Sequence, residues 1–183
     1  VEVIDPEKNS SKISYRKDLL NDWKQKVLEV KEVDPNGLQV FTIYNAQKLI
    51  QRIAKKDPSN KILDDLKYSY DSDGNRTWEN HNVYSEGKIL QTSVTQWVFD
   101  SMDRCTQIVE AVGTPDQRRT QFRYTPTGQQ AKVIKEGGLE IHYSYTPLDW
   151  LHRVKSSDAS IDFTYVYDKR GNIISVREGV SDV

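Results

Sequence analysis

An aromatic residue recurs seven times along this chain at near-regular spacing, and a turn-forming segment follows most of the copies. The separations between successive copies are 29, 26, 29, 25, 21 and 22 residues. A repeat of this length indicates an array of similar supersecondary units, and not one catalytic domain. The repeats are expected to start near Tyr15, Tyr44, Tyr70, Phe99, Tyr124, Tyr145 and Tyr167.

A second aromatic residue stands two positions before most of these. Residues two apart on a strand point to the same face of a sheet, and aromatic residues favour strands. Each pair therefore predicts a strand with two rings on one face, where cross-strand ring contacts add about 0.2–1 kcal/mol each. The pairs are Tyr68 and Tyr70, Trp97 and Phe99, Phe122 and Tyr124, Tyr143 and Tyr145, and Tyr165 and Tyr167.

Turn formers come directly after the aromatic residue. An Asp or Thr in first place and a Pro in second place favour a type I turn, and a Gly in fourth place accepts the positive φ that closes a hairpin. The residues that carry this signal are Asp71, Gly74, Asp100, Gly128, Asp168 and Gly171, with Thr146-Pro147-Leu-Asp149 as a variant.

A second strand is expected after each turn. It carries an apolar residue nine positions past the aromatic residue, namely Ile53, Ile108, Val133, Val154 or Val176, before the next loop. Strand, tight turn, strand and loop then repeat. The sequence therefore predicts an all-β fold, a repetitive antiparallel meander of about seven hairpins in one curved sheet.

Two segments fit this pattern less well. Tyr15 is followed by Arg16-Lys-Asp-Leu-Leu, which is no clear turn, and Asp22 to Val30 reads as a strand or a short helix, of which we expect the strand. Lys61-Ile-Leu together with Asp64 and Asp65 is expected to be a longer connector between two repeats.

Composition narrows the classes of function. The chain has 26 basic and 27 acidic residues, so no overall field favours nucleic acid or an anionic membrane. It has no apolar run long enough to span a bilayer. The chain starts at Val1 and the repeats continue to its C-terminal end. We therefore expect residues 1–183 to be one repeat segment of a longer polypeptide.

The motif Tyr-Asp-x-x-Gly-Asn is complete at Tyr70–Asn75 and at Tyr167–Asn172, and the other repeats are degenerate copies of it. This motif resembles the YD repeat of the Rhs/YD-repeat proteins, over about residues 10–180. The resemblance implies a long antiparallel sheet that spirals into a hollow shell. In bacterial polymorphic toxins and in the C component of insecticidal toxin complexes the shell holds a C-terminal toxin domain, and teneurins use a similar shell for adhesion.

From this resemblance we expect a structural, non-catalytic segment of a shell that encloses and protects a C-terminal toxin or effector. The partners would be flanking repeats and the effector of the same polypeptide, and the protein would be secreted or at the cell surface. The alternative is a cell-surface adhesion or carbohydrate-binding module that binds glycans. The family's self-cleaving segment and its variable toxin domain have no counterpart within these residues. Two exposed sheet edges would favour edge-to-edge self-association of an isolated piece.

No residues indicate catalysis, a cofactor or a metal ion. The three histidines, His81, His142 and His152, lack the close spacing of zinc ligands. Asp71 to Asn75 contains acidic residues, but its Gly stands in the fourth place and not in the sixth that a calcium loop requires. Cys105, the one cysteine, can form no internal disulfide and occupies an apolar slot.

The row of aromatic rings has two interpretations. Rings at matching positions bury apolar area by stacking along the sheet, at about 25 cal/mol per Å². Exposed rings would instead bind sugars or a flexible polypeptide. We expect the rings to serve as core.

Overall fold

The computed structural model describes residues 2–4, 10–20 and 24–179 of the chain. These described residues form fifteen strands, which follow one another in a single sheet in strict chain order from β1 to β15. The predicted all-β antiparallel meander is confirmed. The strands are β1 Glu2–Ile4, β2 Ser10–Leu20, β3 Lys26–Val33, β4 Gln39–Tyr44, β5 Ile50–Lys56, β6 Ile62–Tyr70, β7 Arg76–Ser85, β8 Lys88–Phe99, β9 Cys105–Glu110, β10 Arg118–Tyr124, β11 Gln130–Ile134, β12 Glu140–Tyr145, β13 Leu151–Ser156, β14 Asp162–Tyr167 and β15 Ile173–Glu178.

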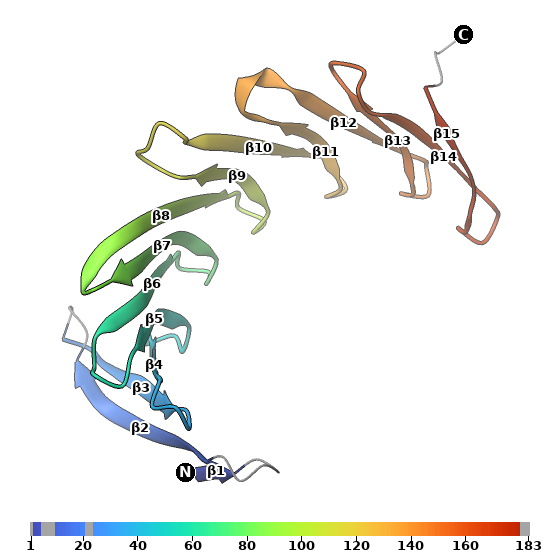
Figure 1. Ribbon diagram of the computed structural model, residues 1–183. Coiled ribbons are helices and arrows are strands. Elements are labelled where there is room, and N and C mark those ends of the chain that lie inside the picture. The colour runs from blue at the N-terminus through green and yellow to red at the C-terminus, as the bar shows by residue number, and fades with distance from the viewer. Residues whose placement is uncertain (1, 5–9, 21–23, 180–183) are drawn as a thin grey trace. The chain divides into compact units, whose positions relative to one another are not determined.

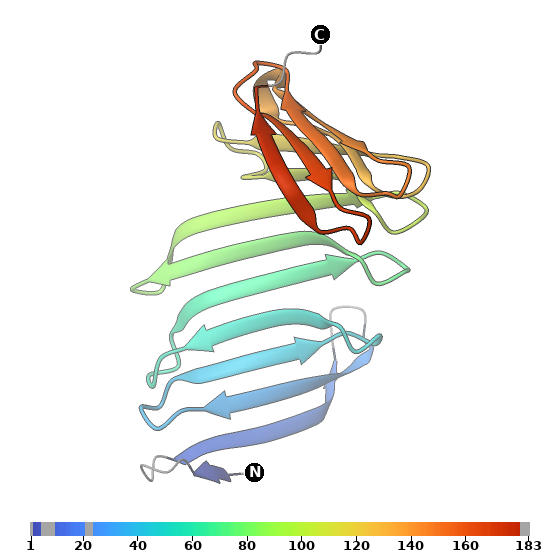
Figure 2. The ribbon, with the colours of Figure 1, turned by 90° about the vertical axis from the view of Figure 1, so that its right-hand side faces the viewer.

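The chain divides into two compact units. The first comprises Val1–Trp97 with Glu110–Pro115, and the second comprises Val98–Val109 with Asp116–Val183. Within each unit, each strand lies beside the one before it in the chain (Figures 1 and 2). The 3-10 turn η1, Glu136–Gly138, joins β11 to β12, and no helix in the described ranges is of a length and hydropathy to cross a membrane.

The two poorly fitting segments are both strands. Lys26–Val33 forms β3, as expected, whereas Asp22 and Trp23 lie outside the described residues. Tyr15 lies in the middle of β2, is 58% exposed, and the strand continues past it to Leu20.

The connector expected at residues 61–65 is wrong, because β6 begins at Ile62 and includes both aspartates. Asp65 is 2% exposed, and its Oδ1 accepts a hydrogen bond of 2.6 Å from Arg52 Nε on the neighbouring strand. Asp64 contacts His81 Nε2 at 2.5 Å and Lys55 Nζ at 3.4 Å. Two adjacent acidic residues favour a loop when the sequence is considered alone. In the strand, basic side chains on neighbouring strands compensate their negative charges.

The same cross-strand pairing recurs in the second unit. Arg153 Nε donates to Asp162 at 2.8 Å, and Lys132 Nζ donates to Glu140 at 2.9 Å. In each case the cation stands eight residues after a repeat aromatic and its partner lies on the next strand. A cross-strand ion pair at this position therefore recurs in three of the six repeats, once in the first unit and twice in the second.

The aromatic rings are not the buried core that we expected. The buried apolar side chains of the described residues are Val27, Ala54, Val109 and Val133, and every repeat aromatic from Tyr44 onward is half-buried. Among the residues nine positions after the aromatic, Val133 is buried whereas Val176 is 53% exposed. Within each unit the sheet is a single layer, so a ring can be covered by its neighbours on the same face but by no second layer.

Candidate functional site at the junction between repeats

The repeat aromatics end their strands. Tyr44, Tyr70, Phe99, Tyr124, Tyr145 and Tyr167 are the last residues of β4, β6, β8, β10, β12 and β14. The register of pairing shifts directly before five of these six, which is the mark of a β-bulge. We number positions within a repeat from this aromatic residue, which is position 0.

The turn that follows has the same hydrogen bonds in all six repeats. The backbone N–H of position 1 donates to the carbonyl of position 5, and the N–H of position 4 donates to the carbonyl of position 1. In the last repeat, Asp168 N–H donates to the Asn172 carbonyl at 2.9 Å, and Gly171 N–H donates to the Asp168 carbonyl at 3.2 Å. The residue at position 4 always has positive φ, from 59° at Asp103 to 95° at Gly128. The positive φ predicted for Gly74, Gly128 and Gly171 is thus observed, and Lys48, Asp103 and Asp149 adopt it without a glycine.

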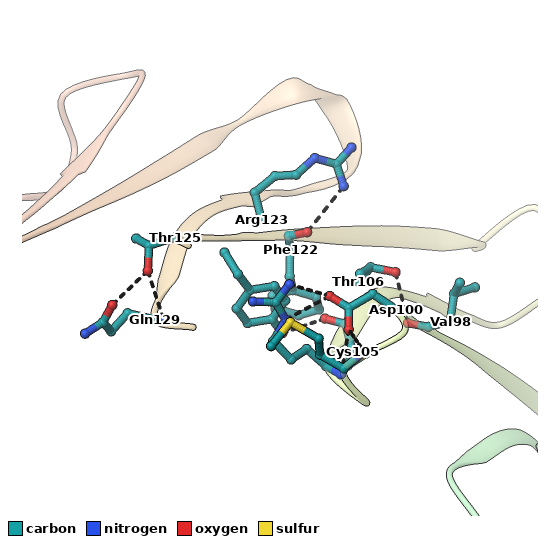
Figure 3. Close-up of polar contacts among 11 residues, drawn as sticks. Val98, Asp100, Cys105, Thr106, Phe122, Arg123, Thr125 and Gln129 are labelled. Carbon is teal, nitrogen blue, oxygen red and sulfur yellow. Dashed lines mark hydrogen bonds and ion pairs between the residues drawn. The ribbon is translucent and has the colours of Figure 1, made fainter. Parts of the chain in front are cut away.

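The side chain at position 1 holds the turn together. Asp168 Oδ1 accepts the backbone N–H groups of Arg170 at 2.8 Å and Asn172 at 2.9 Å, while its Oδ2 accepts Asn172 Nδ2. These bonds hold the pKa of Asp168 below its usual value, and the bond from the Asn172 side-chain amide has the largest effect. At Asp100 the hydrogen bond from the guanidinium of Arg104 lowers the pKa most. Thr125 Oγ1 accepts the backbone N–H of Gln129 at 3.1 Å, as an Asp would, but it donates its own hydrogen to Gln129 Oε1 at 2.7 Å (Figure 3).

In four of the repeats, the hydroxyl group of the tyrosine at position 0 links the repeat to the one before it. Each of these four hydroxyls donates to the backbone carbonyl at position 6 of the preceding repeat. Phe99 has no hydroxyl group to donate. The bonds run from Tyr70 to Ile50 at 2.7 Å, from Tyr124 to Cys105 at 2.6 Å, from Tyr145 to Gln130 at 2.8 Å and from Tyr167 to Leu151 at 2.7 Å.

The side chain at position 5 covers the next repeat. The Trp150 and Tyr167 ring centroids lie 5.3 Å apart, and a Cβ built on Gly171 would come within 3.0 Å of the same indole. Arg104 lies over the Tyr124 ring with its Cζ 4.8 Å from the centroid. Position 4 of the last repeat must therefore stay small for two reasons, its positive φ and the indole packed against it.

The aromatics at position −2 are bonded differently from those at position 0. Arg76 lies over two of them, with its Cζ 5.3 Å from the Tyr68 centroid and 4.7 Å from that of Trp97. The hydroxyls of Tyr68, Tyr143 and Tyr165 have no hydrogen-bond partner among the described residues. These hydroxyls are therefore open to a ligand, whereas those at position 0 are committed to the fold.

Two pockets occupy the same place in two different repeats. The first, of about 310 Å³ in the first unit, includes Gln47 and Gln51 from positions 3 and 7 and Tyr68 and Tyr70 from the next repeat. The second, of about 430 Å³ in the second unit, includes Leu148, His152, Tyr165 and Tyr167 at the same positions, with Trp150 at position 5. We call them the Gln47 pocket and the Trp150 pocket.

Among the described residues, the structure does not bring titratable side chains together into a reactive centre. Desolvation raises the pKa of the Cys105 thiol, which favours the protonated, less reactive form. His142 is exposed, and its Nε2 lies 2.9 Å from a Glu140 carboxylate oxygen. In the part of the chain that the structure describes, no three His, Cys, Asp or Glu side chains gather as a metal site would require.

Sequence reasoning missed two features of the junction. The hydroxyl-to-carbonyl bond has a signal in the sequence, because the acceptor always stands six positions after the previous aromatic, but its chemistry appears only when the strands are placed. A turn of the same type follows β3, where Asp34 Oδ1 accepts Asn36 N at 2.9 Å and Leu38 N at 2.8 Å. Its sequence, Asp34-Pro-Asn-Gly37, lacks the preceding aromatic that marks the others.

A solved structure with the same fold comes from a Tc toxin. A structure of the Photorhabdus luminescens Tc holotoxin pore, with a mutation in TccC3, matches 100% of this chain at 12% identity and a TM-score of 0.54. The chain shares the fold of the segment of the holotoxin chain that it matches. A crystal structure of TcdB2–TccC3–Cdc42 matches 92% of the chain at 14% identity and a TM-score of 0.43.

The chain spans only about 12% of the length of the holotoxin chain that it matches. No protein-family model matches the sequence, and no curated protein matches it either. The similarity to the holotoxin structure is therefore one of fold, over the whole chain and at low sequence identity.

Proposed function

We propose that this chain is a non-catalytic segment of the wall of a shell that encloses and protects a C-terminal toxin or effector of the same polypeptide. The observation that carries the proposal is the fold match over the whole chain to a segment of a Tc holotoxin. On this proposal the partners are flanking repeats and the enclosed effector, and the protein is secreted.

The junctions between repeats suit such a wall. A one-layer sheet exposes both faces, so its strands must be held by their own hydrogen bonds and by contacts along each face. The Asx-type turns, the tyrosine hydroxyl bonds and the charged pairs supply such contacts repeat by repeat. A wall of this kind can be extended by adding repeats, because each contacts chiefly its neighbours.

The test uses the full-length polypeptide that contains these residues. After size-exclusion chromatography under native conditions, a denaturing gel is expected to show a separate C-terminal fragment that co-elutes with the repeats and resists added protease. As a control, the purified C-terminal fragment and the purified repeats are unfolded, refolded and mixed. This control shows how the fragment behaves when it only adheres to the outer surface of the repeats. A single uncleaved band whose C-terminal region is digested as fast as a free domain would contradict enclosure.

A glycan-binding module is the second candidate, and one observation favours it. The Gln47 pocket presents side-chain amides beside the Tyr68 ring, and the Gln51 amide has no side-chain partner among the described residues. Amides and aromatic rings together suit the hydroxyls and the apolar face of a sugar. Binding of this chain to a glycan array, abolished by Gln51→Ala but not by Gln91→Ala, would favour this candidate, and no binding would remove it.

A further inference from the structure

The Trp150 pocket differs in chemistry from its counterpart in the first unit. Where the Gln47 pocket has an alanine and amides on the turn and the following strand, this one has Pro147 and Leu148 on the turn and His152 on the strand. Position 5, which is Leu49 in the earlier repeat, is Trp150. The same backbone frame thus carries a mostly apolar concavity of about 430 Å³ in the second unit.

The indole wall of this pocket is fixed before any ligand arrives. Trp150 packs against the Tyr167 ring, with 5.3 Å between centroids, and lies so close to Gly171 that a Cβ there would be 3.0 Å from the indole. Tyr167 is in turn held by its hydroxyl bond to the Leu151 carbonyl at 2.7 Å. A preformed aromatic wall lowers the entropy lost when a ligand binds.

Two polar groups of the pocket are left unused by the fold. The Tyr165 hydroxyl and the His152 imidazole both line it, and neither has a side-chain hydrogen-bond partner among the described residues. A purely aliphatic ligand would cover the half-buried Tyr165 hydroxyl without giving it a partner, and a sugar would bring more hydroxyls than these two groups can bond, because most of the remaining lining is apolar. A planar ring with one polar substituent satisfies both constraints.

We propose that the Trp150 pocket binds one aromatic ring that carries a single hydrogen-bonding substituent, as in a phenol. The ring lies against Trp150, Pro147 and Leu148, and its hydroxyl bonds to His152 or Tyr165. This site is independent of the proposed shell, since it stands on the contacts within one repeat junction. The ligand is either a free small molecule or the side chain of a tyrosine in a polypeptide.

The test is a titration of the isotopically labelled chain with 4-methylphenol, followed through the indole N–H resonance of Trp150, which Trp150→Phe assigns. A ring of this size is expected to bind with a dissociation constant of about 1 mM. Toluene is expected to bind about five- to tenfold more weakly, because it lacks the hydroxyl group. Methyl glucoside is expected to cause no saturable shift.

Variants separate the pocket from the surface at large. Leu148, 65% exposed, can be changed to Ser without harm to the fold, and Leu148→Ser is expected to weaken 4-methylphenol binding severalfold. Leu90→Ser, at a residue 72% exposed on β8, is the matched control and should leave binding unchanged. The double variant His152→Ala with Tyr165→Phe should reduce 4-methylphenol to the affinity of toluene.

A blocked tyrosine tripeptide distinguishes the two sources. Tighter binding of the peptide than of 4-methylphenol assigns the pocket to a tyrosine side chain of a polypeptide, and weaker binding assigns it to a free small molecule. The proposal is overturned if 4-methylphenol causes no saturable shift at Trp150, if toluene binds equally well, or if Leu148→Ser and Leu90→Ser behave alike.

Discussion

The hydroxyl group of Tyr145 gives the sharpest test of how one repeat is fixed to the next. It donates to the backbone carbonyl of Gln130 at 2.8 Å, whereas the hydroxyl of Tyr143, on the same strand and two residues earlier, has no partner among the described residues. Burial raises the pKa of Tyr145, so its hydroxyl stays a donor at neutral pH. The two residues therefore form a matched pair for Tyr→Phe substitution.

The expected loss for Tyr145→Phe is about 1 kcal/mol, the net value of one neutral hydrogen bond in a half-buried place. The full penalty of a buried, orphaned carbonyl is not expected, because Tyr145 is only half-buried and water can reach the site. Tyr143→Phe is expected to change the free energy of unfolding by less than about 0.3 kcal/mol, since the hydroxyl that it removes has no partner among the described residues.

The assay is urea denaturation followed by far-ultraviolet circular dichroism, with the slope of the transition compared among the three proteins. An array of repeats need not unfold in one step, so amide hydrogen exchange around Gln130 is the second measurement. A loss of about 1 kcal/mol should speed exchange there about fivefold. Equal effects of the two substitutions, or a larger effect of Tyr143→Phe, would refute the claim that this bond joins the repeats.

Further substitutions test the turn and the faces of the strand. Gly87→Ala and Gly171→Ala should each destabilise the fold by about 1–2 kcal/mol, because both positions have positive φ. Gly171→Ala should cost about 1 kcal/mol more, because only there would the new Cβ meet Trp150, and thermal unfolding of the two variants measures the difference. Tyr145→Ala should lose about 3 kcal/mol in urea denaturation and Ser144→Ala close to nothing, and equal losses would mean that the faces are misassigned. Hydrogen bonds from Ser156 and Ser160 lower the pKa of Asp158 from 3.8 to about 2, so its ionised form is favoured in the folded chain. That contribution is present above pH 3.8 and is lost as the pH falls through about 2, and Asp158→Asn should flatten the fall of the urea midpoint across this range.

The strand-turn-strand order was readable from the sequence because its signals are local. An aromatic pair two residues apart makes a strand, and an Asp or Thr followed by a Gly three residues later makes the turn, whatever lies elsewhere in the chain. Phe163 to Val176 shows this most clearly, since strand, turn and strand stand there with every turn residue in place. The all-β meander follows directly from repeating such a unit.

The depth of each ring and the partners of each polar group were decided by the tertiary structure. Tyr165 and Tyr167 look alike in sequence, yet the bulge before Tyr167 and the neighbouring strand bring only the latter's hydroxyl to a carbonyl. Asp65 read as a loop residue because its partner Arg52 stands 13 positions away on another strand. Local sequence determines which residues form strands and turns, whereas burial and hydrogen bonding depend on which strands become neighbours, and that is a property of the assembled sheet.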